Sequence, residues 1–537
     1  MHDYIVVGAG SAGCAVAGRL SEDPAARVLL LEAGGRDGAL FIRGPGLYYM
    51  LWRGKNDWAF RTEPQPEVGG RRMFWPRGKV LGGSSSLNAM IYIRGHRANY
   101  DGWRDAGNPG WGYDDVLPYF KRAENWCLAP SPFHGSGGPL DVREVGPCAP
   151  SADAFIDAAV EKLGVRRNDD FNGAEQEGAG HYQYTVRGGS RWSAADAYLR
   201  PARPNLEIRT GAQTLGLVIK SGRVEGVRYL DGNQERVATA SKEVILAGGS
   251  IGSPHLLLLS GIGPADHLRA KGIKVAHELP GVGENLQDHL LTVVQYRTLA
   301  RGSTNYSLLA SLGWLGRFAL FGTGPLTYPP VQTGAFVRTR PGLARPDLQF
   351  HVLPWGGFTP NFDEKVGPDL GAFLTMLPTL IYPESRGTLR LRSADPTVAP
   401  AIDPRYFSAK ADLDLLVAGV KMARDVATAP ALKKWLGDEV APGPKARSDE
   451  EIRADIRLRC NTIFHPVGTC KMGSGDDAVV DAQLRVRGLD GLRVVDGSIM
   501  PTVIGGNTHA PIVMIGEKAA DLIAGRAVLS PVKSQVA

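Results

Sequence analysis

The chain has 537 residues, of which 43% are hydrophobic and 22% are charged, and its formal net charge is +6. This length exceeds what one hydrophobic core usually supports, so two or more domains are expected. The mild charge, without a cluster of Lys and Arg, argues against a nucleic-acid-binding surface.

The first predicted element is a buried strand over Tyr4–Val7, followed by the glycine-rich turn G-A-G-S-A-G at 8–13. Gly8 allows a tight turn, Gly10 lets a pyrophosphate approach the backbone, and Gly13 lets the next helix pack closely. That helix, expected from Ser11 to about residue 21, directs its first N–H groups at phosphates. The pattern predicts a dinucleotide site.

A second apolar strand, R-V-L-L-L-E at 27–32, ends on Glu32, 19 positions after Gly13. A carboxylate at this point can bind both hydroxyls of an adenosine ribose, and it would repel a 2′-phosphate. The motif therefore disfavours NADP and leaves FAD or NAD open.

Another glycine-rich block lies at 77–95, where Gly82 and Gly83 precede three serines. Such residues suit a backbone that wraps a polar ligand. Further along, 205–229 alternates like an antiparallel hairpin with its turn at Ser221–Gly222. Residues 243–263 then predict a strand, a glycine turn and a short helix.

From about residue 300 to 440 the composition shifts toward proline and aromatic residues, which indicates a separate substrate domain. Y-P-E-S-R-G-T-L-R-L-R at 382–392 predicts a turn and a strand. Near the end, V-V-D-G-S-I-M-P at 494–501 predicts a strand running into a loop. A final helix follows, with Pro511 in its first turn and Gly525 at its end.

Two histidines stand in glycine- and proline-rich loops near this end of the chain: His465 in F-H-P-V-G-T-C-K-M-G, and His509 in G-N-T-H-A-P. Alcohol oxidation requires a group that takes the hydroxyl proton, and neutral imidazole, with a pKa of ~6.5, suits that task. The pair predicts proton-transfer chemistry, and the helix after His509 would stabilise negative charge on a reduced ring system.

Five segments in this order resemble the glucose–methanol–choline (GMC) oxidoreductases, most closely the choline-dehydrogenase-like bacterial FAD-dependent alcohol dehydrogenases. They are G-K-V-L-G-G-S-S-S-L-N (78–88), G-S-I-G-S-P-H-L-L-L-L-S-G-I-G (249–263), H-P-V-G-T-C-K-M-G, D-G-S-I-M-P and G-N-T-H-A-P. The resemblance implies an α/β (α+β two-domain) fold. A Rossmann-like FAD-binding domain would comprise 1–155, 195–300 and 475–537. A discontinuous substrate-binding domain, an antiparallel sheet with helices, would comprise 156–194 and 301–474.

The resemblance also implies the cofactor and the residues that serve it. FAD would be the cofactor, His465 the principal catalytic histidine, and His509 the second catalytic position. The residues expected to hold FAD are Gly8, Gly10, Ser11, Ala12, Gly13, Glu32, Ala33, Gly82, Gly83, Ser84, Asn88, Ala89, Met90, Asp496, Gly497, Asn507 and Thr508.

Two departures from the family pattern bear on how FAD is attached and on which alcohol is oxidised. Leu87 occupies the place where some members attach flavin through a histidine, so FAD should be non-covalent. Arg297 stands where choline-oxidising members carry a glutamate, so we expect choline to be disfavoured. His351 aligns with a substrate-pocket region, and with Arg297 it completes the expected pocket residues.

The resulting prediction is oxidation of a primary alcohol or polyol by hydride transfer to flavin N5, with His465 as base. Two alternatives stay open: an oxygen-using alcohol oxidase, and a hydroxynitrile-lyase-type flavoprotein whose FAD is redox-idle. The electron acceptor, a quinone, a redox protein or oxygen, is undetermined, with Ile463 and Ala89 near the point that would control oxygen.

The expected location is the cytoplasm, and the expected number of metal sites is zero. Five scattered cysteines show no metal-site spacing and fit a reducing compartment. The first strand begins too early for a signal peptide, and no apolar run reaches the ~18 residues of a transmembrane helix. Peripheral contact with the inner membrane is left open.

Overall fold

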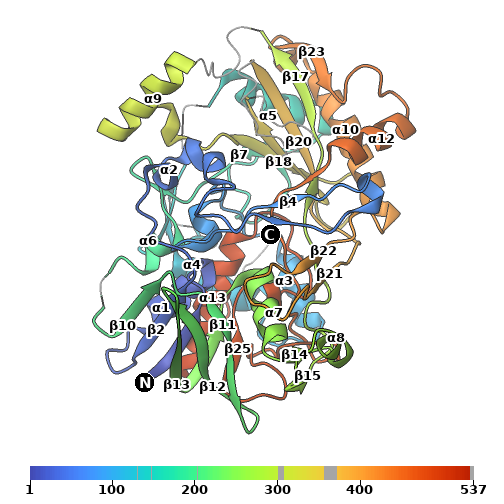
Figure 1. The fold of residues 1–537 in the computed structure, drawn as a ribbon. Helices are drawn as coiled ribbons and strands as arrows, with labels where there is room; N and C mark the ends of the chain where they lie inside the picture. Colours follow the sequence, from blue (N-terminus) through green and yellow to red (C-terminus); the bar gives the residue numbers. More distant parts are fainter. Residues whose placement is uncertain are drawn as a thin grey trace.

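In the computed structural model the described residues are 1–129, 131–144, 146, 148–201, 203–299, 308–355 and 372–532. Two sheets, one above the other in Figure 1, form the frame of the molecule. The lower sheet combines parallel strands with an antiparallel hairpin, and the upper sheet is antiparallel. The predicted fold class is confirmed.

The lower sheet has the strand order β10-β2-β1-β13-β12-β11, with β25 paired to β13. Its central strands β1 and β2 are continuous apolar runs because both of their faces are covered. The predicted hairpin turn at Ser221–Gly222 joins β11 to β12, whereas β10 pairs in parallel with β2. The strands are β1 (His2–Val7), β2 (Val28–Glu32), β10 (Leu206–Thr210), β11 (Thr214–Lys220), β12 (Arg223–Asp231), β13 (Gln234–Leu246) and β25 (Leu492–Val494).

The first and last long helices of the chain, α1 (Ser11–Leu20) and α13 (His509–Ala524), pack directly on each other. A Cβ added at Gly516 would lie 2.9 Å from Ala15 Cβ, so the two backbones approach closely. Arg19 of α1 pairs with the buried Glu517 of α13 at 2.9 Å. This packing brings the glycine-rich turn beside the residues that precede α13.

The final helix starts two residues before Pro511 and is capped by Gly525 with a φ of 64°. Its predicted end is confirmed, and His509 lies in its first turn rather than ahead of it.

The upper sheet has the order β23-β17-β20-β19-β18-β7, with β16 paired to β20 and β24. Helices α5 (Pro150–Leu163) and α10 (Lys410–Ala427) cover it. β16 and β17 belong to this sheet, although they lie within 195–300, which the sequence assigned to the FAD-binding domain. The strands are β7 (Gly178–His181), β16 (Leu290–Leu291), β17 (Val294–Thr298), β18 (Thr333–Val337), β19 (Leu348–Leu353), β20 (Phe373–Leu380), β23 (Leu436–Ala441) and β24 (Asn461–Thr462).

The remaining helices and short strands lie outside the two large sheets. The helices are α2 (Leu40–Arg43), α3 (Arg97–Asp105), α4 (Tyr113–Ala123), α6 (Ala194–Tyr198), α7 (Gly249–Leu259), α8 (Ala265–Ala270), α9 (Leu308–Phe321), α11 (Pro430–Lys433) and α12 (Asp449–Arg459), with 3-10 turns η1 (Pro45–Leu51), η2 (Pro66–Val68), η3 (Gly83–Ser86), η4 (Pro325–Thr327) and η5 (Gly497–Ile499). The short strands are β3 (Phe60–Arg61), β4 (Phe74–Trp75), β5 (Glu124–Trp126), β6 (Leu140–Val142), β8 (Val186–Arg187), β9 (Ser190–Arg191), β14 (Ile262–Gly263), β15 (His277–Glu278), β21 (Thr388–Arg390) and β22 (Ala401–Asp403).

Candidate active site

A long pocket of about 530 Å³ runs along the carboxyl ends of the parallel strands. Ligands of open α/β sheets bind at this edge. It extends from Glu32, at the end of β2, to the start of α13. The predicted cofactor residues that line it are Gly8, Gly10, Ser11, Ala12, Glu32, Ala33, Gly83, Ser84, Asp496, Gly497 and Thr508.

The turn between β1 and α1 leaves no room for a side chain at Gly8 or Gly13. A Cβ at Gly13 would lie 1.9 Å from the carbonyl oxygen of Gly8, and Gly8 itself has a φ of +99°. Gly10 caps α1 without a side-chain hydrogen bond, and the first turn of the helix carries no acidic residue. Its N–H groups are therefore available to a phosphate.

Glu32 is held at one end of the long pocket by two backbone donors. Its carboxylate accepts hydrogen bonds from Ala9 N at 2.9 Å and from Gly34 N at 2.8 Å. Burial raises the pKa of Glu32 to about 7, against the opposing effect of these two donors. The carboxylate lines the pocket where a ribose is expected.

Asp496 orders the other end of the pocket by joining two elements. Its carboxylate accepts hydrogen bonds from Gly249 N and Ser253 Oγ of α7, and from Ser498 N of η5. Burial raises its pKa. Asp496 thus positions the backbone around Gly497, which also lines the pocket.

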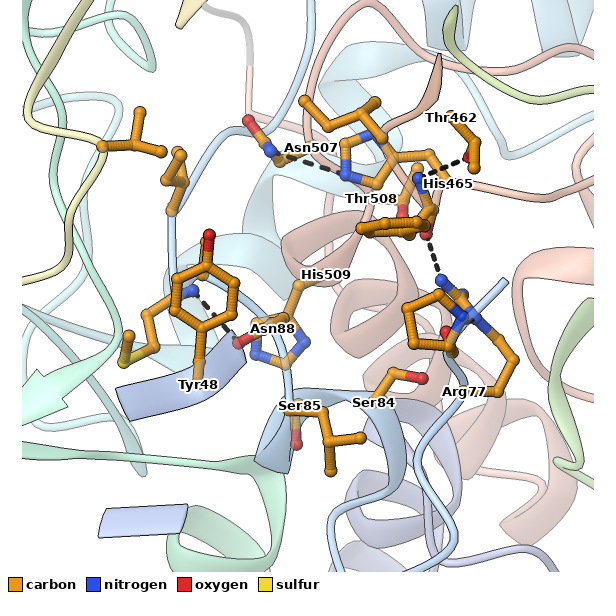
Figure 2. A pocket seen from close by; sticks show the side chains of 18 of the residues that line it. Tyr48, Arg77, Ser84, Ser85, Asn88, Thr462, His465, Asn507, Thr508 and His509 are labelled. Carbon is orange, nitrogen blue, oxygen red and sulfur yellow. Dashed lines mark hydrogen bonds between the residues drawn. The ribbon is translucent and has the colours of Figure 1, made fainter. Parts of the chain in front are cut away.

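A smaller inner pocket of about 150 Å³ adjoins the long pocket, and the two share Ser11, Arg77, Ser84, Thr508 and Ile512 in their walls. Figure 2 shows His465, Asn507 and His509 around it. The predicted site residues that line this inner pocket are Ser11, Ser84, Asn88, Ala89, Met90, His351, His465, Asn507, Thr508 and His509.

His465 makes two side-chain hydrogen bonds, one at each ring nitrogen. Its Nδ1 lies 3.0 Å from Nδ1 of His289. Its Nε2 lies 3.4 Å from Nδ2 of Asn507 (Figure 2). Removal from water, and then the neighbouring histidines and Arg77, hold the pKa of His465 well below its usual range. The ring is therefore neutral at pH 7.

The partners of His289 determine which nitrogen of His465 carries the proton. Nε2 of His289 lies 3.0 Å from the carbonyl oxygen of Ile381, which only accepts, so this nitrogen is protonated. Burial lowers the pKa of His289 to about 4, so its Nδ1 is bare and accepts from Nδ1–H of His465. Nε2 of His465 consequently carries a lone pair at the inner pocket, where it faces Nδ2 of Asn507.

The loop that carries His465 is held by buried polar groups. Asp288 accepts hydrogen bonds from the backbone N–H of His465, at 2.8 Å, and from the hydroxyls of Thr462 and Tyr406. Arg77 donates to the carbonyl oxygen of Phe464 (Figure 2). These bonds fix the peptide that joins Phe464 to His465.

His509 and His351 each have one buried ring nitrogen, Nε2, without a hydrogen-bond partner in the protein. Nδ1 of His509 lies 2.9 Å from Ser11 Oγ, and Nδ1 of His351 lies 3.1 Å from Thr379 Oγ1. Burial lowers the pKa of His509 to about 4 and that of His351 to about 3. Because both residues line the inner pocket, their unpaired nitrogens indicate contacts reserved for a ligand.

Three of the predicted residues do not line either pocket. Gly13 and Gly82 shape the backbone, and Gly82 does so with a φ of +87°. Arg297 is exposed on β17, and its guanidinium lies over the ring of Phe373. Its position therefore gives no support to the argument that it repels choline from the site.

Sequence reasoning missed His289 and Asp288, although both stand in the segment G-V-G-E-N-L-Q-D-H at 281–289. The adjacent Asp and His after a glycine-rich loop could have indicated a functional site. Their contact with His465 spans 176 positions for His289 and is created by the β16–β24 pairing.

Two models of one family match the chain, both described as GMC oxidoreductase: an N-terminal model over residues 2–291 and a C-terminal model over residues 383–516. Among curated relatives, "Alcohol dehydrogenase [acceptor]" of Pseudomonas putida is 44% identical over 97% of this chain and 96% of its own. "Choline dehydrogenase, mitochondrial" of Homo sapiens is 43% identical over 98% of this chain and 90% of its own.

Solved structures give the same picture of the fold. Pyridoxine 4-oxidase from "Mesorbium loti" superimposes with a TM-score of 0.89 at 33% identity, covering 98% of this chain and 100% of that one. Formate oxidase superimposes with a TM-score of 0.91 at 27% identity, covering 98% of each chain.

Proposed function

Because the chain belongs to the GMC oxidoreductase family, we propose that it oxidises a small apolar primary alcohol, with FAD bound in the two joined pockets. The observation that carries this proposal is the unprotonated Nε2 of His465 at the inner pocket. The name of the alcohol dehydrogenase from Pseudomonas putida supports the reaction class.

FAD is the family's cofactor, and the long pocket fits its ADP half. The turn over Gly8 and Gly10 and the uncapped start of α1 would take the pyrophosphate, and Glu32 the adenosine ribose. The flavin end would lie toward Ser84 and Thr508, where the pockets meet. Bound there, FAD would supply the acceptor for the hydride that leaves the alcohol carbon.

We further propose that FAD is held without a covalent bond. Leu87 lines the inner pocket at the position where the sequence resemblance would place an attachment histidine. An aliphatic side chain has no atom that can form such a link. Acid precipitation of the protein should therefore release all of its flavin into the supernatant.

His465 would take the proton from the substrate hydroxyl. Its Nδ1–H is engaged by His289, so only Nε2 can accept that proton, and the low pKa keeps it unprotonated at neutral pH. The unpaired Nε2 atoms of His351 and His509 lie in the walls of the same pocket, available to orient the hydroxyl.

The composition of the inner pocket favours a neutral, apolar alcohol over a polyol or choline. Among its described lining residues none is a carboxylate, and the one charged group is Arg77. A quaternary ammonium would find no countercharge there, and the additional hydroxyls of a polyol would compete for the pocket's polar side chains with the reacting hydroxyl. The apolar walls are Leu87, Met90, Ile91, Leu291, Val331, Leu377, Ile463 and Phe464.

The decisive test is anaerobic flavin reduction in the His465→Ala variant. The variant should bind FAD with an unchanged visible spectrum. Bleaching of the flavin by substrate should slow ~100- to 10,000-fold, which is the usual contribution of a general base to the reaction rate. His267→Ala, on α8 and outside both pockets, is the matched control and should bleach normally. Unchanged bleaching in His465→Ala would remove the assigned role. A wild-type enzyme that turns over without any bleaching would instead be a lyase.

The substrate assignment is tested with straight-chain primary alcohols, glycerol and choline, each assayed with an artificial acceptor and with oxygen while peroxide is followed. We expect kcat/KM to rise with chain length and to exceed that of choline at least tenfold. Peroxide formed at the rate of turnover in air would identify an oxidase. Efficient turnover of choline would contradict the proposed substrate class.

A further inference from the structure

An exposed apolar surface lies beside the substrate half of the molecule, where α9 projects next to α2 (Figure 1). Of the fourteen large apolar side chains exposed among the described residues, six fall in two short segments, 40–50 and 312–321. Single exposed apolar residues are ordinary, whereas a cluster marks an interaction site. We call this cluster the α2–α9 surface; it consists of Leu40, Phe41, Met50, Leu312, Leu320 and Phe321.

The two segments are parts of one surface because α9 packs on the chain that follows α2. Phe318 forms a buried cluster with Leu47 of η1 and Leu326 of η4. A Cβ added at Gly44, the residue after α2, would lie 3.2 Å from the ring of Phe318. With Phe318 turned inward, Leu320 and Phe321 remain 76% and 73% exposed.

All charged residues within the two segments that build this surface are cationic. Residues 38–56 and 308–332 contain three arginines and one lysine, and no aspartate or glutamate. Arg43 pairs with Asp37 and Asp196. Arg53 lies over the ring of Phe74 and Arg317 donates to Thr323 Oγ1, and both side chains are exposed, as is Lys55. Two tryptophans, Trp52 and Trp314, lie partly exposed in the same segments.

We propose that the α2–α9 surface docks the protein on a lipid bilayer that carries anionic headgroups. Apolar side chains rimmed by cations and tryptophan match the boundary between acyl chains and acidic headgroups. A second copy of the chain fits less well, because a two-fold contact sets a surface against itself and would bring Arg53, Lys55 and Arg317 against like charges.

The helix lies in the bilayer surface and does not cross it. With 14 residues, α9 is roughly 21 Å long, shorter than the ~30 Å hydrocarbon core. Among the described residues, no helix has both the length and the apolar character to span a membrane.

Docking would place the inner pocket close to the bilayer. The 3-10 turn η1, which packs against α9, contributes Tyr48 to the pocket wall, and Trp52 follows directly after it. η4 leads within four residues to Val331, another lining residue. A membrane-dissolved reactant would therefore have a short path to the site.

The test is sedimentation of the full-length, FAD-loaded protein with vesicles of equimolar phosphatidylcholine and phosphatidylglycerol, and with pure phosphatidylcholine. We expect binding mainly to the anionic vesicles. The double variant Leu320→Glu, Phe321→Glu should weaken it at least a hundredfold, since two large apolar contacts are lost. Arg317→Gln should weaken it about fivefold.

Leu458→Glu is the matched control, because Leu458 is 55% exposed on α12, away from this surface, and the change should leave binding unaltered. Turnover of a water-soluble alcohol should be equal in all variants, which separates this proposal from the proposed function. Absence of vesicle binding, or equal binding by the double variant, would overturn the proposal. A wild-type dimer in sedimentation equilibrium that the double variant dissociates would assign the surface to a second copy instead.

Discussion

The long pocket and the inner pocket are built in opposite ways. The long pocket has glycine-rich backbone in its wall, at 8–12, 83–84 and 248–252, beside side chains such as Glu32 and Asp496. The inner pocket is formed by side chains, and its histidines His351, His465 and His509 come from β19, from a loop after β24 and from α13. The proposed cofactor site therefore depends on close backbone packing, whereas the proposed catalytic site depends on contacts between side chains far apart in the sequence.

Gly13 should be the position of the long pocket's backbone frame that is most sensitive to substitution. A Cβ there would lie 1.9 Å from a backbone oxygen that has no room to move, so Gly13→Ala should abolish FAD binding and lower the yield of folded protein. Visible absorption and circular dichroism measure both effects. Gly102→Ala is the control, because a Cβ at that position of α3 meets nothing within 4 Å and the change should be neutral.

The inner pocket should be the acid-sensitive part of the molecule. Burial lowers the pKa values of His289 and His509 to about 4 and of His351 to about 3, so these rings stay neutral in the fold while the unfolded chain takes up protons below ~6.5. Their contribution to stability is therefore complete above pH 6.5. It is lost as the pH falls toward 4, by at most about 1.4 kcal/mol per histidine and pH unit.

Thermal unfolding followed between pH 8 and 4 checks this expectation. His289→Asn, which removes one of the three groups, should make the decline shallower. An equally steep decline in the variant would place the acid sensitivity elsewhere.

Substitution of His289 should affect flavin reduction without affecting FAD binding. His289→Ala should slow flavin reduction about 10- to 100-fold, the usual cost of losing a group that orients a catalytic residue, and should leave FAD affinity unchanged. His289→Asn offers a carbonyl oxygen to Nδ1–H of His465 and should restore part of the rate. The pH profile of reduction should shift in the alanine variant, which a purely structural role would not produce.

The smallest expected effect is on FAD affinity, when Glu32 of the long pocket is substituted. Glu32→Gln keeps the shape but removes the charge from the ribose contact, so FAD affinity should fall about tenfold while kcat of the FAD-saturated enzyme is unchanged. Fluorescence titration of the apoprotein with FAD measures the affinity. Glu207→Gln, on the neighbouring strand β10 and outside both pockets, is the control.

Local patterns predicted the elements that are decided by nearby residues. The strand, turn and helix at 4–20, the hairpin turn at Ser221–Gly222 and the end of the last helix at Gly525 were all predicted correctly. Predictions of which strands pair with each other were less accurate. β10 pairs with β2 rather than extending the hairpin, and β16 and β17 join the upper sheet.

In the candidate site, too, the residues in local loop motifs were identified correctly and a residue whose position depends on strand register was not. His465 and His509 were identified from their loops, and both line the inner pocket. Arg297 was assigned to the pocket by its place in a motif, but β17 points it to the solvent, over Phe373. Motif position indicates a strand, and only the register of that strand decides which face a side chain occupies.

The family, the dinucleotide turn and the two loops that carry the histidines can be identified from the sequence, because they depend on residue types at fixed short spacings. The chemistry available at His465 depends instead on the fold. The contact that leaves its Nε2 unprotonated comes from His289, 176 positions away, and exists because β16 pairs with β24. A proton's position on an imidazole is set by its hydrogen-bond partners, and those partners are chosen by the fold.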